Sequence, residues 1–293
     1  MVPKPILKGL TGKSPAIREV NRLIHKASRN DYPLLISGET GVGKSMAAEC
    51  IHRLSRRGSK SFLQQGCSNI PAELFESELF GHEKGAFTGA VRRRAGKMEI
   101  AAGGTLFLDE VADLGFDCQS KILLFLDKGK FFRLGGEEEI EVDVRIIAAS
   151  NKDLKEEIKA GRFREDLYFR LNVFEIHIPP LRERKEDIPL LVNEILKEAE
   201  KRNKVSKKIF SPAMEKLMGY YFPGNIRELE NIVLRAFVMA EADVLKPDDI
   251  KIEPMSYREE DIVNKLFKLM VRHGMSFWEA MHKPFLQREL NRR

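Results

Sequence analysis

The feature that most constrains the fold of this chain is a glycine-rich segment of the form G-x-x-x-x-G-K-[ST] at residues 38–45. An apolar run at residues 34–36 precedes it, and a predicted helix over residues 45–54 follows it. A strand, a glycine-rich turn and a helix N-terminus in this order place backbone N–H groups around a phosphate. These flanks argue against a chance glycine-rich turn and predict a nucleotide-binding α/β fold.

The residues of this segment have separate expected roles. Lys44 is expected to reach the β- and γ-phosphates, and the Ser45 hydroxyl is expected to ligate Mg²⁺. A nucleoside triphosphate and Mg²⁺ are therefore the predicted ligands of this loop. The residues predicted to contact the nucleotide are the whole loop and the start of its helix: Gly38, Glu39, Thr40, Gly41, Val42, Gly43, Lys44, Ser45 and Met46.

A second motif is a predicted strand at residues 106–108 that ends in two acids, Asp109 and Glu110. A carboxylate beside a phosphate loop can hold Mg²⁺, and a second one can polarise the attacking water. We assign Asp109 to the metal and Glu110 to the water. Taken alone, the pair could equally be a solvated strand end. Together with the loop, it predicts hydrolysis of a nucleoside triphosphate.

Composition excludes several other classes of protein. The 293 residues are 43% hydrophobic and 32% charged, which is typical of a globular protein and not of a disordered one. No apolar run approaches the roughly 20 residues of a membrane helix. The cysteines are three in number and widely spaced, which argues against a disulfide framework and for a reducing cytosol. The net charge of +6 permits anionic partners without identifying them.

The order of the predicted elements indicates a parallel α/β sheet with flanking helices, followed by a small helical domain. Short strands are expected at residues 34–36, 62–63, 106–108, 144–149 and 173–176. Pro179 and Pro180 break this pattern, and helices are expected beyond them at residues 188–202, 212–221 and 225–240, with Ser211 as an N-cap. We therefore divide the chain into domains at residues 1–179, 180–250 and 251–293. The last stretch is expected to form helices at residues 261–272 and 277–290.

Between the two nucleotide motifs, residues 80–91 contain the sequence Gly-Ala-Phe-Thr-Gly-Ala at residues 85–90. Two glycines frame a single large apolar side chain, Phe87. A flexible loop with an aromatic tip suits insertion into another surface. Composition alone favours the other interpretation, a surface turn whose phenylalanine packs back onto its own domain.

This segment resembles the GAFTGA loop of the bacterial sigma-54-dependent transcriptional activators, also called enhancer-binding proteins, which are AAA+ ATPases. The resemblance covers roughly residues 10–250, and further family signatures occur in order at residues 81–90, 103–110, 163–168, 170–173, 180–184, 187–189 and 223–231. It implies an AAA+ P-loop fold with a helical lid. It also implies a ring of six or seven subunits that uses ATP to remodel the sigma-54 RNA polymerase closed complex towards the open complex.

The resemblance also implies roles for single residues. The sigma-54 contact falls on Gly85, Ala86, Phe87, Thr88, Gly89 and Ala90. Asn151 resembles the sensor I residue beside the γ-phosphate, and Arg227 resembles the sensor II residue on the lid. Arg164 and Arg170 resemble arginine fingers, which complete catalysis in the neighbouring subunit together with its Lys44, Asp109 and Glu110. For these residues, a strand-end turn, a solvated arginine and an ion pair to Glu165 or Asp166 remain the simpler interpretations.

The chain departs from the family pattern at two positions. Ser45 stands where many members carry glutamate, which leaves Mg²⁺ binding intact. Gly66 stands where the family usually has an asparagine that restrains the catalytic glutamate. Either Gln65, Ser68 or Asn69 takes over that role, or the coupling between nucleotide and loop is altered.

The resemblance implies sigma-54 in the holoenzyme and further copies of the chain as partners, and we expect the protein in the bacterial cytoplasm, away from membranes. Promoter or enhancer DNA is a possible partner, and Arg92, Arg93 and Arg94 could steer it or simply form a solvated charge run. Residues 11–16 resemble the start of the ATPase domain, so no sensing domain is expected before them. Residues 276–285 do not match the common helix-turn-helix form, so no DNA-reading domain is evident, and the chain is either truncated or lacks a DNA reader of its own.

Three alternatives to this function remain open at the level of sequence. An AAA+ DNA remodeller has no reason to carry residues 85–90. A small-molecule kinase has no use for arginine fingers. A non-catalytic, nucleotide-gated assembly module is kept open by Gly66.

Overall fold

The computed structural model describes residues 9–68 and 71–252. The chain divides into two compact units, Met1–Lys251 and Ile252–Arg293, and the described residues fall almost entirely in the first. The helices expected at residues 261–272 and 277–290 lie outside the described residues. In the described part of the chain, no helix is both long enough and apolar enough to span a bilayer.

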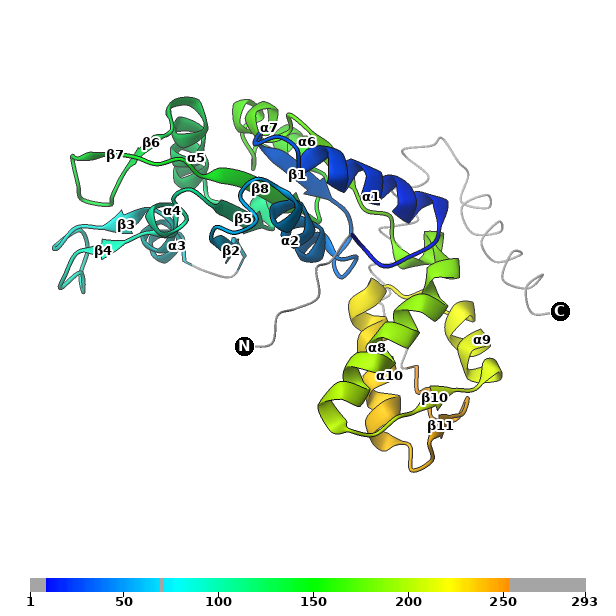
Figure 1. Ribbon diagram of the computed structural model, residues 1–293. Helices are drawn as coiled ribbons and strands as arrows, with labels where there is room; N and C mark the ends of the chain where they lie inside the picture. Colours follow the sequence, from blue (N-terminus) through cyan, green and yellow to red (C-terminus); the bar gives the residue numbers. More distant parts are fainter. Residues whose placement is uncertain (1–8, 69–70, 253–293) are drawn as a thin grey trace. The chain divides into compact units, whose positions relative to one another are not determined.

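A five-stranded parallel sheet forms the centre of the first unit (Figure 1). Its strand order is β2-β5-β8-β1-β9. The strands are β1 (Leu34–Ser37), β2 (Phe62–Gly66), β5 (Thr105–Asp109), β8 (Arg145–Ser150) and β9 (Glu175–His177). All five expected strands and the expected α/β class are confirmed. The apolar runs form strands because helices cover both faces of the sheet, as parallel sheets require.

Successive residues of each strand point to opposite faces of the sheet and pack into two separate hydrophobic cores. Ile36, Phe107 and Ile147 pack with α1 (Pro15–Ala27) and α2 (Lys44–Leu54). Their neighbours along each strand face a second core. That core includes residues of α3 (Ala72–Phe80), α4 (Lys97–Ile100), α5 (Phe116–Lys128), α6 (Leu154–Lys159) and α7 (Glu165–Leu171). Because the strands are anchored from both sides, the loops at their ends are held on a rigid base.

Two short hairpins extend from this body. In the first, β3 (Gly81–His82) pairs with β4 (Arg94–Ala95), and in the second, β6 (Lys130–Phe132) pairs with β7 (Glu139–Glu141). A bridge between His82 and Leu134 joins them, and Figure 1 shows them beside each other at one end of the α/β body. We call residues 83–93, which connect β3 to β4, the hairpin loop.

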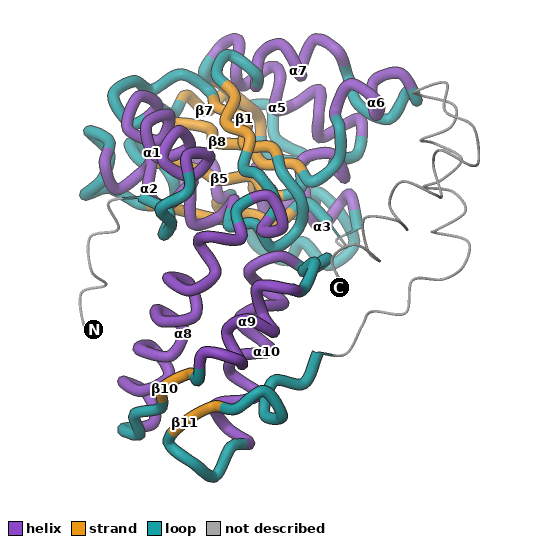
Figure 2. Tube along the Cα trace, turned by 90° about the vertical axis from the view of Figure 1, so that its right-hand side faces the viewer, coloured by secondary structure: helices purple, strands orange, loops and turns teal. Residues whose placement is uncertain are grey.

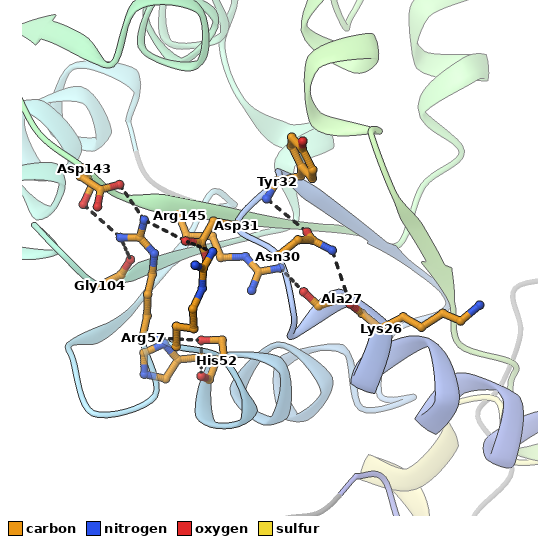
Figure 3. A network of polar contacts seen from close by, with 12 residues as sticks. Lys26, Ala27, Asn30, Asp31, Tyr32, His52, Arg57, Gly104, Asp143 and Arg145 are labelled. Atoms are coloured by element: carbon orange, nitrogen blue, oxygen red, sulfur yellow. Dashed lines mark hydrogen bonds and ion pairs between the residues drawn. The ribbon is translucent and has the colours of Figure 1, made fainter.

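The amino ends of the strands are fixed by a network of arginines (Figure 3). Arg145 begins β8, is fully buried and donates to the Ala27 carbonyl at 2.8 Å. Burial lowers the pKa of Arg145 to about 10. Arg57 donates to the Asp143 carboxylate at 2.7 Å and also pairs with Asp31. This network joins the end of α1 to the amino ends of the strands, on the opposite side of the sheet from their carboxyl ends.

The helical part contains three helices, α8 (Ile188–Asn203), α9 (Ser211–Gly219) and α10 (Asn225–Met239). Two 3-10 turns, η2 (Leu181–Glu183) and η3 (Lys185–Asp187), lead into it, and β10 (Lys208–Ile209) pairs with β11 (Val244–Leu245). Figure 2 shows the three helices side by side. The three expected helices are confirmed, but the expected N-cap is wrong by one residue, because the extended Phe210 caps α9 and Ser211 already belongs to the first turn.

Candidate functional site

The phosphate loop lies between β1 and α2, at the carboxyl ends of the strands. Two of its glycines are required by close backbone approaches. A Cβ at Gly38 would lie 2.7 Å from the Ile178 carbonyl oxygen, and one at Gly41 would lie 2.3 Å from that of Gly224. Gly41 also has φ +82°, where side chains are strained. The backbone at Ile178 and at Gly224 is therefore packed closely against the phosphate loop.

Lys44 begins α2 and is buried behind the loop. Its Nζ donates to the carbonyls of Gly38 at 2.8 Å and Glu39 at 3.0 Å. Burial lowers the pKa of Lys44, although the negative charges of Asp109 and Glu110 oppose this. A positive charge held in a desolvated position next to the loop interacts strongly with phosphate oxygens.

The two predicted metal ligands meet in space. The Ser45 hydroxyl donates to Asp109 Oδ2 at 3.3 Å. Burial raises the pKa of Asp109, and the nearby Lys44 works in the opposite direction. A hydroxyl and a carboxylate are hard oxygen ligands, the kind that Mg²⁺ prefers. The donor set present here therefore fits the predicted Mg²⁺.

Glu110 has an unusual backbone. Its φ is +61°, in the left-handed region that is uncommon for residues other than glycine. It follows the last residue of β5 and precedes the 3-10 turn η1 (Val111–Asp113). Such strained positions cluster at functional sites. The geometry thus places a partly exposed carboxylate one residue beyond Asp109.

The predicted sensor residues also reach the loop. Asn151 follows β8, and its amide donates to the Thr40 hydroxyl at 3.1 Å. Arg227 lies in the first turn of α10, and its Cβ is 3.2 Å from the position of a Cβ on Gly41. Its charge contributes to lowering the pKa of Lys44. Both residues therefore border the place where phosphates would lie.

The two predicted arginine fingers are held elsewhere: Arg164 is the N-cap residue of α7, and Arg170 lies in the last turn of α7. Arg164 donates to Asp166 at 2.7 Å, which is an ion pair that the sequence left open, and Arg170 forms an ion pair with Asp127 at 2.7 Å. Their side chains are 37% and 60% exposed. The described chain therefore presents both arginines at its surface instead of bonding them to its own phosphate loop.

The hairpin loop has little support around its glycines. Gly85 and Gly89 have φ of +85° and +104°, and no atom lies within 4 Å of a Cβ at either position. Thr88 is exposed. Phe87 is half-buried, with its ring edge-on to His82 at a centroid distance of 5.0 Å. Phe87 thus packs in part against its own hairpin, which is the interpretation that composition alone favoured.

A buried arginine connects the two hairpins, and the sequence analysis missed it. Arg133 lies in the turn between β6 and β7, and its side chain is 4% exposed. It pairs with Glu83 at 2.9 Å and with Glu99 at 2.5 Å. Burial acts to raise the pKa of Glu99, but its hydrogen bonds and the Arg133 charge outweigh this, and the pKa is lowered. No local pattern signals a cluster whose members lie this far apart in sequence.

The structure shows which side chains lie around Gly66, the position where the family usually has an asparagine. A Cβ at Gly66 would meet no atom within 4 Å. Gln64, two residues earlier on the same face of β2, places its amide nitrogen 3.5 Å from Asp109 Oδ2. Gln65 instead donates to the Gly66 carbonyl, and Asn69 lies outside the described residues. The amide that approaches Asp109, the residue before Glu110, therefore comes from Gln64, which the sequence analysis did not name.

Comparison with known proteins gives matches over nearly the whole described chain. Residues 10–177 match the sigma-54 interaction domain, and residues 182–264 match an AAA+ ATPase lid domain. The response regulator PilR of Pseudomonas aeruginosa is 47% identical over 85% of this chain and 56% of its own length. The Nif-specific regulatory protein of Klebsiella pneumoniae is 47% identical over 83% of this chain and 47% of its own. The chain thus spans about half the length of these relatives.

Solved structures give the same result. The crystal structure of NtrX from Brucella abortus in complex with ATP has a TM-score of 0.75 at 32% identity, covering 93% of this chain and 65% of that one. The ADP complex of NtrX has a TM-score of 0.77 at 31% identity, covering 97% of this chain and 69% of that one.

Proposed function

The chain belongs to the sigma-54 interaction domain family of AAA+ proteins, and on that premise we propose that it hydrolyses ATP as a ring and remodels the sigma-54 RNA polymerase closed complex. One observation carries this proposal. The chain leaves the sheet at β2, forms the hairpin loop and returns at β5, and these two strands pair so that Gly66 lies opposite Asp109. A change at the acidic pair can thereby displace the hairpin loop.

The chemistry at the loop follows from the residues that meet there. Backbone N–H groups of the loop and Lys44 would bind the phosphates, and Ser45 and Asp109 would hold Mg²⁺, which would neutralise phosphate charge. Glu110 orients the attacking water and accepts its proton. Asn151 fixes the Thr40 side chain, and Arg227 adds positive charge from the lid.

We assign Arg164 and Arg170 to the ATP of a neighbouring subunit. Both sit at the surface of α7 in ion pairs that are 37–60% exposed, so exchanging those partners for a phosphate costs little. A guanidinium supplied in trans makes hydrolysis depend on assembly. ATP turnover per subunit should rise with protein concentration. Arg170→Ala should lose that rise while still binding nucleotide, and turnover that is independent of concentration would contradict the ring.

The hairpin loop is assigned to sigma-54, with Phe87 and Thr88 as contact residues. Thr88 is exposed, and Phe87 is half-buried with its ring against His82, so Thr88 and the exposed part of Phe87 face outwards, where a partner can reach them. Thr88→Ala should abolish sigma-54 engagement and retain ATP hydrolysis. Unchanged promoter activation by this variant would remove the loop from the mechanism.

Promoter DNA is a further proposed partner in the bacterial cytoplasm, where RNA polymerase acts. Arg93 and Arg94 pair with Glu83 and Glu78, so part of this positive charge is already neutralised within the chain. Binding of promoter DNA that does not weaken with added salt would exclude an electrostatic role for these arginines.

A further inference from the structure

The outer side of the phosphate loop is held by residues that belong to the helical part and to the turn leading into it. Four successive loop residues, Glu39, Thr40, Gly41 and Val42, each accept at least one such hydrogen bond. Across a trans peptide bond, the carbonyl of one residue points opposite to the N–H of the next. Bonding the carbonyls on one side therefore helps direct the N–H groups to the other side, where a phosphate would bind.

The first contact is a two-pronged ion pair. Arg182, in η2, donates from both terminal nitrogens to the Glu39 carboxylate at 2.7 and 2.5 Å. Its guanidinium also stacks over the Tyr221 ring at 4.9 Å. A bidentate arginine pair fixes direction as well as distance. Glu39 is therefore held towards the lid, away from the place of the phosphates.

The second contact is made by a buried amide. Asn225 is fully buried, begins α10 and has φ +55°. Its Nδ2 donates to the Thr40 carbonyl at 3.0 Å and to Glu39 Oε2 at 3.1 Å, while its Oδ1 accepts from the Leu181 N–H at 2.8 Å. Three parts of the chain are thus joined by a single side chain.

Two further bonds complete the set. The Ile226 N–H, at the start of α10, donates to the Gly41 carbonyl at 3.0 Å. Arg184, which is fully buried, donates to the Val42 carbonyl at 3.0 Å. The close approach of Gly41 to Gly224 lies at the same junction.

We propose that Arg182 and Asn225 are positioning residues of the nucleotide site: Arg182 holds the Glu39 side chain and Asn225 holds the Thr40 carbonyl, so that the N–H groups of the loop are preorganised for a polyphosphate and the loop moves together with the lid. This inference rests on the proposed use of the loop for nucleotide binding. Neither residue needs to touch the nucleotide. Their effect is passed through Glu39 and Thr40, and it concerns the phosphates and not the base.

The test measures binding of ADP and of adenosine to the full chain. Arg182→Gln should weaken ADP binding about tenfold and leave adenosine binding unchanged, because adenosine carries no phosphate. Glu39→Gln should have a similar effect, and the double variant should be no weaker than either single one, because both act through one contact. Arg182→Lys should rescue only partly, since lysine cannot make the bidentate pair.

A second substitution and a matched control guard against misfolding. Asn225→Gly removes the amide, and glycine readily adopts the positive φ of this position. This variant should also weaken the binding of ADP and leave the binding of adenosine unchanged. Arg22→Gln breaks the exposed pair of Arg22 with Glu19 on α1 and should change neither affinity. Melting temperatures without nucleotide show whether each variant is folded.

Three outcomes would overturn parts of the account. If the wild-type chain binds no ADP, the proposed function fails and the inference falls with it. If the wild type binds ADP and the folded variants bind it equally well, the inference alone is wrong. Equal weakening of ADP and adenosine would show a general structural role and would also overturn the inference.

Discussion

The two glycine-rich loops of this chain look similar in sequence but have opposite surroundings. At the phosphate loop, a Cβ on Gly41 would collide with a backbone oxygen at 2.3 Å, whereas a Cβ on Gly85 or Gly89 in the hairpin loop would meet nothing within 4 Å. The phosphate loop is bonded from the lid at four successive residues. The hairpin loop is held through the pair of Arg133 with Glu83, a backbone bond from Glu83 to Leu134 and the two-residue strands beneath it.

This difference shows two uses of glycine. In the phosphate loop, glycine allows close approach and gives a rigid cradle, since the surrounding backbone fixes its shape. In the hairpin loop, glycine supplies positive φ without any packing, so the loop can change conformation at low cost. A rigid site that binds phosphate and a loosely held tip that contacts a partner are what a nucleotide-driven remodeller requires.

The largest expected effect falls on the phosphate loop and leaves the hairpin loop unchanged. Lys44→Ala removes the buried charge behind the phosphate loop, and ATP turnover should fall at least about 10²-fold. The hairpin loop should keep its protease resistance in the nucleotide-free state, because Lys44 contacts only Gly38 and Glu39 among the described carbonyls. Turnover close to that of the wild type would place the reaction elsewhere.

The next effect should appear only in the hairpins. Arg133→Gln leaves the carboxylates of Glu83 and Glu99 facing a neutral amide, which should destabilise this region by about 1–3 kcal/mol. Hydrogen exchange of the two hairpins should quicken, while the sheet stays protected. Arg22→Gln, which breaks the exposed pair with Glu19, is the matched control. Equal exchange in both variants would show that Arg133 does not support the hairpin loop.

A pair of alanine substitutions tests the glycine comparison itself. Gly41→Ala adds both a clash and backbone strain, and it should weaken ADP binding about tenfold or more. Gly89→Ala adds only the strain of its positive φ, about 1 kcal/mol, and should leave ADP binding intact. Isothermal titration of both variants measures the contrast. Comparable losses of ADP affinity would contradict the assigned difference between the loops.

The smallest effect concerns pH. The pKa of Glu99 is lowered from its ordinary value of 4.5, so its contribution to stability is complete above pH 4.5 and is lost as the pH falls through its folded value. Hydrogen exchange of the hairpins should therefore quicken in acid before that of the sheet does. In Glu99→Gln this acid-induced step should be absent, and an unchanged step would assign it to another group.

The sequence predicts well what depends on local pattern. Five apolar runs became the five strands, and the phosphate-loop motif placed the start of the following helix at Ser45, one residue after α2 begins at Lys44. The acidic pair and Asn151 could be placed because parallel strands bring their carboxyl ends to one edge. The four strands of the hairpins have only two or three residues each, too few to show a period.

Contacts between distant residues could not be predicted in the same way. Asn225 reaches Glu39 across 186 positions, and Arg133 reaches Glu99 across 34. The sequence motifs around Glu39 and Asn225 do not predict which groups their polar side chains bind. The role of Gln64 was missed for a related reason, since only the pairing of β2 with β5 shows which amide lies near Asp109.

The most direct measurement of the central claim is binding of sigma-54 to this chain with ADP and aluminium fluoride, which mimics the transition state of hydrolysis. The account predicts binding that appears only with this mimic and is lost in Phe87→Ala, while that variant still hydrolyses ATP. Binding that is equally strong without nucleotide, or that survives Phe87→Ala, would contradict the coupling of the phosphate loop to the hairpin loop.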